Sequence, residues 1–485
     1  MVQRKMGINI VLNTFKTVLT ILFPIFTYPY VTRVLGVSNI GAVNLSASII
    51  SYFAMFASLG ISTYAIREGG KVRHDSEKLK YLTDQIFSIH ILATVIAFLF
   101  MLIALPFING MNLKILVLIQ SISIIFSTFG VEWVNILFED YLYITVRSLV
   151  VQLITLISIF LFVRTPGDTV IYVSILTLSS GLICLMNWIY CRRYLKLGIT
   201  WKLNLQKHFK PILILFSGTL AINIYVTSDT ILLGILKGTY YVGIYSLAVK
   251  IYTISKNVLA SIYSTAVARL SVYYGKNDFD NFRKLYTHLI NVITLLLLPL
   301  SSGLLSVAPE VILFMGGSKF TSSILTLQLL SISLVGAIYG GAITYCLNVP
   351  IGKEKINLYG AIYGIVVNIG VSLLLIPMFN QNGTAVATIC SEFFILYYSL
   401  KHVRNMELYF EKKSFLKNLL AAVIESTVIF LLSKVSNFFI SEGFFRLIFI
   451  VISSLASYIA ILKILKNEIY LEILAKLKNK WDSMF

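Results

Sequence analysis

Four cationic residues lie inside long apolar segments of this 485-residue sequence, where charged residues are rare. They are Lys16, Arg147, Lys250 and Lys256. Side chains of this kind bind anions such as phosphate through charge-assisted hydrogen bonds. A lysine or arginine that faces lipid near the centre of a membrane costs roughly 3 kcal/mol or more. Each of the four must therefore meet an acidic side chain, water or an anionic ligand.

Acidic residues are fewer in the same segments. Glu132 and Asp229 are the two that accompany these cations, and both are candidates for ion coupling or gating. Arg67 and Arg269 lie where their segments reach the expected cytoplasmic side, and Arg33 lies near the outer side. Six cations exceed these two acids, and the excess predicts an anionic substrate. The six are Lys16, Arg67, Arg147, Lys250, Lys256 and Arg269.

The composition indicates which elements must position these residues. Hydrophobic residues make up 58% of the chain and charged residues only 13%, about half the roughly 25% of an ordinary soluble domain. This excludes a soluble fold. Because a transmembrane helix needs about 20 mostly apolar residues, the apolar runs predict an all-α polytopic membrane protein with about 14 transmembrane helices. The predicted segments are 7–32, 37–62, 82–106, 111–136, 140–163, 168–190, 211–236, 241–272, 284–308, 322–347, 356–377, 382–402, 416–436 and 443–466.

The net charge of +19 is explained by topology. Most of the 40 Lys and Arg residues fall in the two termini and in alternate loops, which the positive-inside rule places in the cytoplasm. We therefore expect a multi-pass membrane protein with both termini cytoplasmic, and no nucleic-acid partner. One inside loop departs from the rule, because 135–141 carries Glu139 and Asp140 and no cation.

A pattern in the first two spans recurs in the seventh and eighth. Gly41 precedes Arg67 by 26 residues, and Gly243 precedes Arg269 by the same distance. Each glycine follows a Leu-Gly dipeptide, Leu35-Gly36 or Leu233-Gly234. The repeat predicts two pseudo-symmetric six-helix lobes around a central cavity. The predicted divisions are 1–190 for the N-terminal lobe, 191–210 for a basic cytoplasmic linker, 211–402 for the C-terminal lobe and 403–485 for two additional helices and a basic tail.

Polar residues recur every three or four positions in the first, second and eighth spans, which places them on one face of each helix. In the first span they include Asn9, Asn13, Lys16 and Thr20. We expect these faces to line the cavity, although serine, threonine and asparagine also join packed helices by hydrogen bonds.

Pro24 and Pro29 interrupt the same first span, and each removes a backbone hydrogen bond. They are candidate hinges, although membrane helices also tolerate proline without such a role. Glu392 and Glu425 lie in later spans, where helix packing and ion binding are both open roles.

The sequence carries no catalytic or metal-binding motif. The five histidines form no H-E-x-x-H or H-x-x-x-H pattern, and no G-x-x-x-x-G-K-[ST] loop occurs. We therefore expect no metal, no cofactor and no ATPase. The hydrophilic loops are short, so an enzyme is not expected either. The cysteines lack C-x-x-C spacing and are expected to be packing residues: Cys184, Cys191, Cys346 and Cys390.

Several runs of residues carry a resemblance to a known family. They are Tyr28–Gly36 with the later Gly41, Tyr52-Phe53, Leu59–Ile61, Gly130–Trp133, Ile144–Ser148, Ser228–Gly234 and Val242–Ser246. Together they resemble Wzx-type polysaccharide repeat-unit flippases of the multidrug/oligosaccharidyl-lipid/polysaccharide exporter superfamily. The resemblance covers roughly residues 1–400 in order.

The resemblance implies movement of an undecaprenyl-pyrophosphate-linked oligosaccharide from the inner to the outer leaflet of the bacterial cytoplasmic membrane by alternating access. The diphosphate would meet Lys16, Arg147, Lys250 and either Arg67 or Arg269, while the polyprenyl tail stays in lipid. Arg33 near the outer end would bind the head group as it is drawn out or released. The implied partners are this lipid-linked oligosaccharide, membrane lipids and polysaccharide-assembly proteins such as a polymerase.

Three other functions remain to be weighed. A flippase for a teichoic-acid precursor or lipid II would also handle a phosphate-linked sugar. A drug or cation antiporter would need a cavity dominated by acids, which is the opposite of the charge pattern here. A membrane-embedded glycosyltransferase would need catalytic carboxylates in a sizeable soluble loop.

Overall fold

The computed structural model describes residues 6–403, 412–439, 444–472 and 474–475, and within these ranges the regular structure is entirely helical. Eleven helical segments of the described chain are long and apolar enough to cross a membrane, and a twelfth is the bent pair Leu205–Ala221 and Asn223–Lys237. These twelve match twelve of the predicted segments. The other two, 7–32 and 241–272, fall on the long helices α1 and α10. The predicted all-α polytopic fold is confirmed.

Some sequence predictions fall outside the described residues. The basic N-terminal residues Arg4 and Lys5 and the tail at 476–485 are among them, so the structure does not bear on the predicted cytoplasmic location of the termini. The side chains of Asn9 and Asn13 are also outside the described set.

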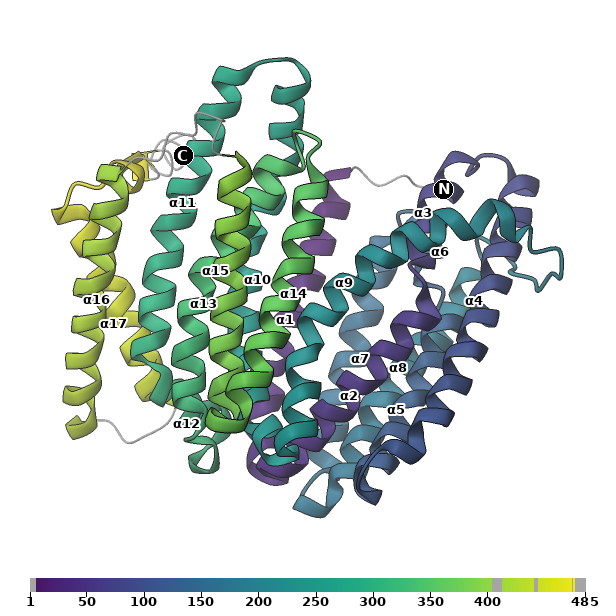
Figure 1. The fold of residues 1–485 in the computed structure, drawn as a ribbon, viewed down its shortest axis with the longest axis horizontal. Coiled ribbons are helices and arrows are strands. Elements are labelled where there is room, and N and C mark those ends of the chain that lie inside the picture. The colour runs from purple at the N-terminus through teal and green to yellow at the C-terminus, as the bar shows by residue number, and fades with distance from the viewer. Residues whose placement is uncertain (1–5, 404–411, 440–443, 473, 476–485) are drawn as a thin grey trace. The chain divides into compact units, whose positions relative to one another are not determined.

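By internal packing the chain divides into two units, and the first runs to Gly243. In unit 1, α5 packs between α2 and α8, while α7 packs between α1 and α8 (Figure 1). Its helices are α1 (Met6–Leu35), α2 (Val37–Ser58), α3 (Ile61–Lys71), α4 (Ser76–Ala104), α5 (Met111–Phe129), α6 (Glu132–Leu137), α7 (Tyr141–Phe162), α8 (Thr169–Cys191), α9 (Leu205–Lys237) and the first residues of α10 (Thr239–Gly275).

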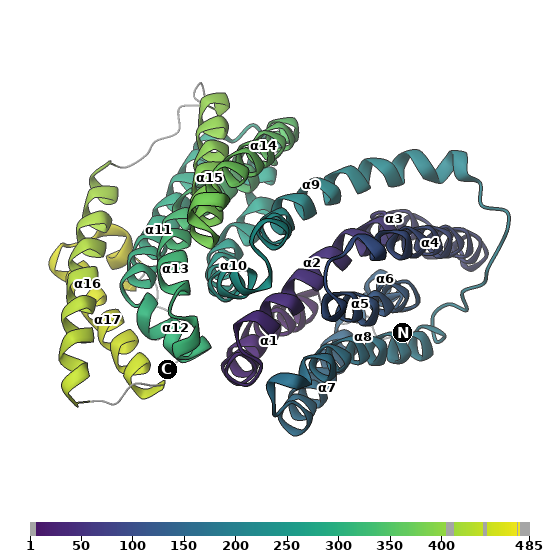
Figure 2. The same cartoon turned by 60° about the horizontal axis from the view of Figure 1, so that its bottom comes forward.

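Unit 2 begins at Ile244 within α10. In it α15 packs against both α13 and α14, and α11 packs against α13 and α16, as Figure 2 shows from a second direction. Its further helices are α11 (Phe279–Ser306), α12 (Ala308–Gly316), α13 (Ser323–Ile343), the π-helical segment η4 (Thr344–Asn348), α14 (Glu354–Phe379), α15 (Gln381–Val403), α16 (Lys412–Phe439) and α17 (Phe444–Ile464).

Residues with positive φ interrupt two of the spans that the sequence predicts as single helices. Between α2 and α3, Leu59 and Gly60 take positive φ values of 45° and 70°. Between α5 and α6, Val131 takes a φ of 35° and is buried. A β-branched residue in the left-handed region is strained, and such strain persists only where the surroundings enforce it. This break redirects the chain immediately before Glu132.

The packing boundary differs from the predicted lobe boundary in 191–210. Helix α9 packs on unit 1, and a Cβ added at Gly60 would lie 3.2 Å from Leu215. The linker before α9 is also tied to α4, because the amide of Gly198 donates to Asp84 Oδ1 at 2.7 Å. A division by packing and a division by sequence repeat need not coincide. The repeat boundaries 1–190 and 211–402 therefore stay a prediction.

The two glycines of the repeat lie against each other's helices in unit 1. A Cβ added at Gly41 in α2 would lie 1.7 Å from the carbonyl oxygen of Thr239. Reciprocally, a Cβ added at Gly243 would lie 2.1 Å from the carbonyl oxygen of Val37. Only glycine permits this approach of two backbones. The repeated glycine thus marks a reciprocal contact between the starts of α2 and α10.

The structure also corrects how the two repeats align before these glycines. Gly36 and Gly238, each five residues before its packing glycine, have matching φ values of 79° and 86°. Gly234, which the sequence pairs with Gly36, instead lies inside α9 against the side chain of Leu45. The structural counterpart of Gly36 is therefore Gly238.

Replacing Gly41 by alanine should destabilise the protein by about 2 kcal/mol or more, because the added methyl group forces two helices apart. The melting temperature of the purified protein measures this effect. The matched control is Gly370→Ala in α14, where an added Cβ meets nothing within 4 Å, so its melting temperature should be unchanged or higher. Equal melting temperatures for the two variants would contradict the close contact.

Candidate functional site

Three of the predicted site residues come together in unit 1. Lys16 Nζ on α1 lies 2.9 Å from Glu132 Oε1 on α6. Arg147 Nη2 on α7 lies 3.0 Å from the other carboxylate oxygen, Oε2. Two cations therefore share one carboxylate, and the cluster carries one net positive charge when all three residues are ionised.

The two cations differ in accessibility. The side chain of Lys16 is 27% exposed and that of Glu132 is 36% exposed, whereas that of Arg147 is 1% exposed. Arg147 also donates through Nη1 to Asn187 Oδ1 on α8, and Asn135 Nδ2 donates to the same oxygen at 3.2 Å. Lys16 is thus the cation that a ligand can reach, and Arg147 is held inside the unit.

A set of tyrosines fixes the start of α7 and the direction of Arg147. The carboxylate of Asp140 caps α7 by accepting from the Tyr143 amide at 3.3 Å. It also accepts from the hydroxyls of Tyr190 at 2.6 Å and Tyr194 at 2.8 Å. Burial raises the pKa of Tyr194, and the nearby Asp140 carboxylate adds to the rise, so this hydroxyl stays a donor. The Tyr143 ring stacks on Tyr190 and lies 5.9 Å from the Arg147 guanidinium.

The acidic loop that departs from the positive-inside rule has a local explanation. Glu139 Oε1 accepts from Arg73 Nη1 at 2.9 Å, so another loop that the sequence predicts to be cytoplasmic supplies the cation that this loop lacks. Asp140 is used by the tyrosines and the helix cap described above.

Contacts between α1 and α7 set the depth of Lys16. Near one end of α1, the Tyr30 hydroxyl donates to the carbonyl of Val163 at 2.7 Å. One turn from Lys16, Gln152 Nε2 donates to Thr20 Oγ1 at 3.4 Å. Lys16 lies about 14 Å along the helix from the start of its predicted span, at 1.5 Å per residue. A cation at this depth needs the carboxylate that α6 presents.

The two prolines of α1 do not end the helix. It runs from Met6 to Leu35 through both Pro24 and Pro29, which are half-buried. Arg33 is exposed in the last turn, where its Nη1 donates to the Pro29 carbonyl at 2.6 Å. The hinge role of the prolines stays a prediction.

The other predicted site residues are distributed over α3, α9 and α10. Arg67 on α3 is half exposed, pairs with Glu68 at 2.9 Å and has its guanidinium 5.6 Å from the Tyr64 ring. Asp229 is buried in α9. On α10, Lys250 is half-buried and Arg269 is exposed. Both α10 residues belong to unit 2.

The structure shows a smaller excess of intramembrane cations over acids than the sequence predicts. In unit 2, Lys256 Nζ on α10 lies 2.8 Å from Glu392 Oε1 on α15. Glu392 therefore neutralises an intramembrane lysine that the sequence leaves unmatched. A second buried pair of this unit joins Arg446 to Glu310 at 3.3 Å, and no local sequence pattern predicts it because the partners lie 136 residues apart. Glu425 is buried in α16.

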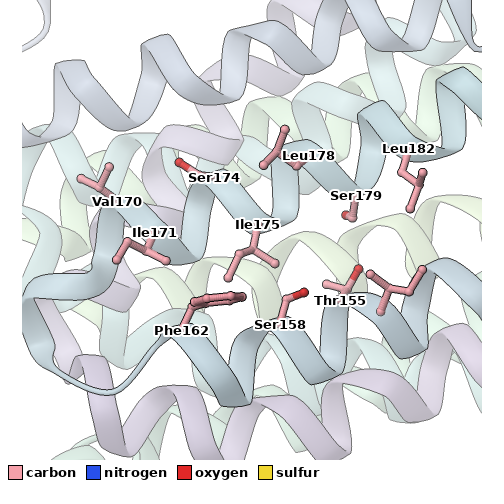
Figure 3. A pocket seen from close by; sticks show the side chains of 11 residues that line it. Thr155, Ser158, Phe162, Val170, Ile171, Ser174, Ile175, Leu178, Ser179 and Leu182 are labelled. Atoms are coloured by element: carbon pink, nitrogen blue, oxygen red, sulfur yellow. The ribbon is translucent and has the colours of Figure 1, made fainter.

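A cavity of about 510 Å³ between α7 and α8 is chemically different from the cluster (Figure 3). Its lining is mostly apolar and includes Ile154, Phe162 and Leu178. Two of its hydroxyls are occupied within their own helices, since Thr155 donates to the carbonyl of Val151 and Ser179 to that of Leu176. The lining carries no charged residue. This apolar cavity is suited to a hydrocarbon chain. The cluster of Lys16, Glu132 and Arg147 remains the candidate site for an anionic group.

Removing Arg147 should destabilise the protein more than removing Lys16. Arg147→Ala takes the buried cation from the cluster and should cost about 3 kcal/mol or more. Lys16→Ala leaves Glu132 paired with Arg147 and should cost about 1 kcal/mol. Thermal unfolding of the purified variants measures the difference. A larger loss of stability for Lys16→Ala would contradict the assigned geometry.

Comparisons with known proteins give the family. The sequence model of the family described as "Polysaccharide biosynthesis protein" matches residues 6–268, more than half of the chain. A putative O-antigen transporter of Shigella dysenteriae is 22% identical over 387 residues, covering 79% of this chain and 96% of that protein.

Two solved structures share the fold. The inward closed lipid II flippase MurJ has a TM-score of 0.74 at 18% identity and covers 96% of this chain and 99% of its own. An inward-facing multidrug resistance MATE transporter of the MOP superfamily has a TM-score of 0.62 at 13% identity, with coverage of 84% and 95%. Twelve of the predicted spans match apolar helices of the described chain, and the family model matches more than half of the sequence. This multi-pass membrane protein therefore belongs to the polysaccharide biosynthesis protein family.

Proposed function

We propose that the protein is a flippase for a lipid-linked oligosaccharide. The substrate is an undecaprenyl-pyrophosphate-linked repeat unit of the capsule, exopolysaccharide or O-antigen type, and it moves from the inner to the outer leaflet by alternating access. Family membership, the O-antigen transporter relative and the shared fold of a lipid II flippase support this proposal.

The observation that carries the proposal is the shared carboxylate in unit 1. Lys16 is partly exposed and lies beside a carboxylate that Arg147 already neutralises. A diphosphate can therefore take Lys16 from Glu132 without leaving Glu132 unpaired inside the membrane. The exchange replaces one charge-assisted pair by another, which keeps its cost low. Lys16 would contact the substrate, and Arg147 would act as a positioning residue.

The other predicted residues keep proposed roles along the path of the head group. Arg33 and Arg67 are exposed in unit 1 and would contact the phosphates before or after Lys16. Lys250 and Arg269 would be the contribution of unit 2. Two further roles are proposed for acids and prolines, with coupling assigned to Glu132 and Asp229 and gating to Pro24 and Pro29.

The proposal includes a location and partners. The protein would reside in the bacterial cytoplasmic membrane with both termini in the cytoplasm, where most of its loop cations would lie. A polymerase and other polysaccharide-assembly proteins would receive the translocated unit.

A substitution at Lys16 tests the function. Lys16→Gln removes the reachable charge and should lower surface polymer at least tenfold in a host that lacks the wild-type protein. The lipid-linked oligosaccharide should accumulate at the same time. Lys16→Arg keeps the charge and should stay within threefold of wild type. Quantification of surface polymer and extracted lipid intermediates gives both readouts.

The matched control is Lys434→Gln, an exposed lysine on α16 that lies over the Phe430 ring. It should leave polymer and lipid pools unchanged, with all variants present at equal amounts in the membrane. Wild-type polymer in Lys16→Gln would overturn the role of the cluster. An unchanged lipid pool with altered drug sensitivity on depletion of the protein would favour an antiporter instead.

A further inference from the structure

Two tyrosines of unit 2 form a supported aromatic surface. The rings of Tyr263 on α10 and Tyr345 in η4 stack with centroids 5.4 Å apart and an angle of 10° between their planes. Tyr263 is buried at 6% exposure, whereas Tyr345 is 48% exposed. A buried ring therefore backs an exposed one, which fixes the orientation of the exposed ring.

The backbone around Tyr345 is specialised. Tyr345 lies in the π-helical segment Thr344–Asn348, and π-helical turns are rare and frequent at functional sites. The segment is held by Asn357, whose side chain accepts from Asn348 Nδ2 at 2.7 Å. One turn earlier, a Cβ added at Gly341 would lie 2.6 Å from the Tyr263 hydroxyl. Glycine at this position gives the Tyr263 ring room to lie under Tyr345.

A charged hydrogen-bonding group, the ammonium of Lys256, lies on the same face of α10 as Tyr263. Lys256 precedes Tyr263 by seven residues, which is two helical turns and about 10 Å. Its ammonium pairs with Glu392, which also accepts from the Tyr252 hydroxyl at 3.3 Å. The Lys256 side chain is 30% exposed and that of Glu392 is 7% exposed, so the ammonium is the donor of this pair that a ligand can reach, and Glu392 holds it in place.

We propose that Tyr345, backed by Tyr263, and the Lys256–Glu392 pair form a carbohydrate-binding subsite in unit 2. The C–H face of a pyranose ring would stack on Tyr345, because the electron-rich face of an aromatic ring attracts the positive edges of C–H groups. A hydroxyl of a neighbouring sugar would accept a hydrogen bond from the Lys256 ammonium, about one disaccharide away. The inference rests on the proposed function and assigns the glycan of the substrate to this subsite.

An exposed tyrosine in a membrane protein has a simpler role, as an anchor at the membrane interface. The two roles differ in what the ring must contact. An anchor tolerates other apolar or aromatic residues and binds no sugar, whereas a stacking platform needs a flat ring. Tyr359 on α14 provides the comparison, because it is exposed to a similar degree, at 51%.

The test uses the full-length protein in lipid nanodiscs and a phosphate-free oligosaccharide, released by mild acid from the lipid-linked pool of the host. Tyr345→Leu should weaken binding of this oligosaccharide at least fivefold. Tyr345→Phe and the control Tyr359→Leu should each stay within twofold of wild type. Gly341→Ala should also weaken binding, because it displaces the backing ring without altering Tyr345 itself. Melting temperatures identify any variant that is misfolded.

Inorganic pyrophosphate serves as the second probe, because it reports on the phosphate-binding residues and not on the sugar subsite. It therefore distinguishes failure of the subsite from failure of the proposed function. Tyr345→Leu should bind pyrophosphate as the wild type does. If Tyr345→Leu binds the oligosaccharide like wild type, or if Tyr359→Leu weakens binding equally, the subsite is wrong and the flippase proposal stands. If the wild type binds neither probe, both proposals are overturned.

Discussion

The sharing of one carboxylate by two cations is the constraint on which the candidate site depends. An unpaired charge at the depth of Lys16 or Arg147 is costly in a membrane, so α1, α6 and α7 must bring their charged groups together at Glu132. The strained turn at Val131 directs α6, and the tyrosines around Asp140 hold the start of α7. Arg147 is buried and stays paired with the Glu132 carboxylate. Lys16 is partly exposed and is the residue that a ligand can reach.

Reciprocal glycine contacts provide the second structural constraint. Gly41 and Gly243 each lie where only a hydrogen atom fits against a backbone carbonyl. Five residues before each of them is a glycine with positive φ, Gly36 or Gly238. The backbone contact fixes how the starts of α2 and α10 cross within unit 1. It also gives the sequence repeat a physical reason, since both copies must keep glycine for the contact to form.

Much of the fold follows from local sequence, because apolar length alone determines where a helix can span a membrane. The helix breaks at Gly60 and Val131 do not follow, since the predicted runs continue through them. At the site, residue type and depth singled out Lys16, Glu132 and Arg147 as candidates, but not their mutual contacts. Glu132 lies 116 residues from Lys16, and Glu392 lies 136 residues from Lys256, so periodicity contains no information about these pairs. The π-helical turn that exposes Tyr345 likewise has no signal in the apolar pattern.

The exchange of Lys16 between Glu132 and a diphosphate can be measured through the affinity of the purified protein for inorganic pyrophosphate, when wild type is compared with Lys16→Gln and Glu132→Gln. If Lys16 exchanges Glu132 for a diphosphate, the two substitutions must act in opposite directions. Lys16→Gln should weaken binding at least tenfold because the reachable cation is gone. Glu132→Gln should strengthen it by a similar factor because the competing carboxylate is gone. Affinities within twofold of wild type for both variants would contradict the exchange of Lys16 between Glu132 and a diphosphate.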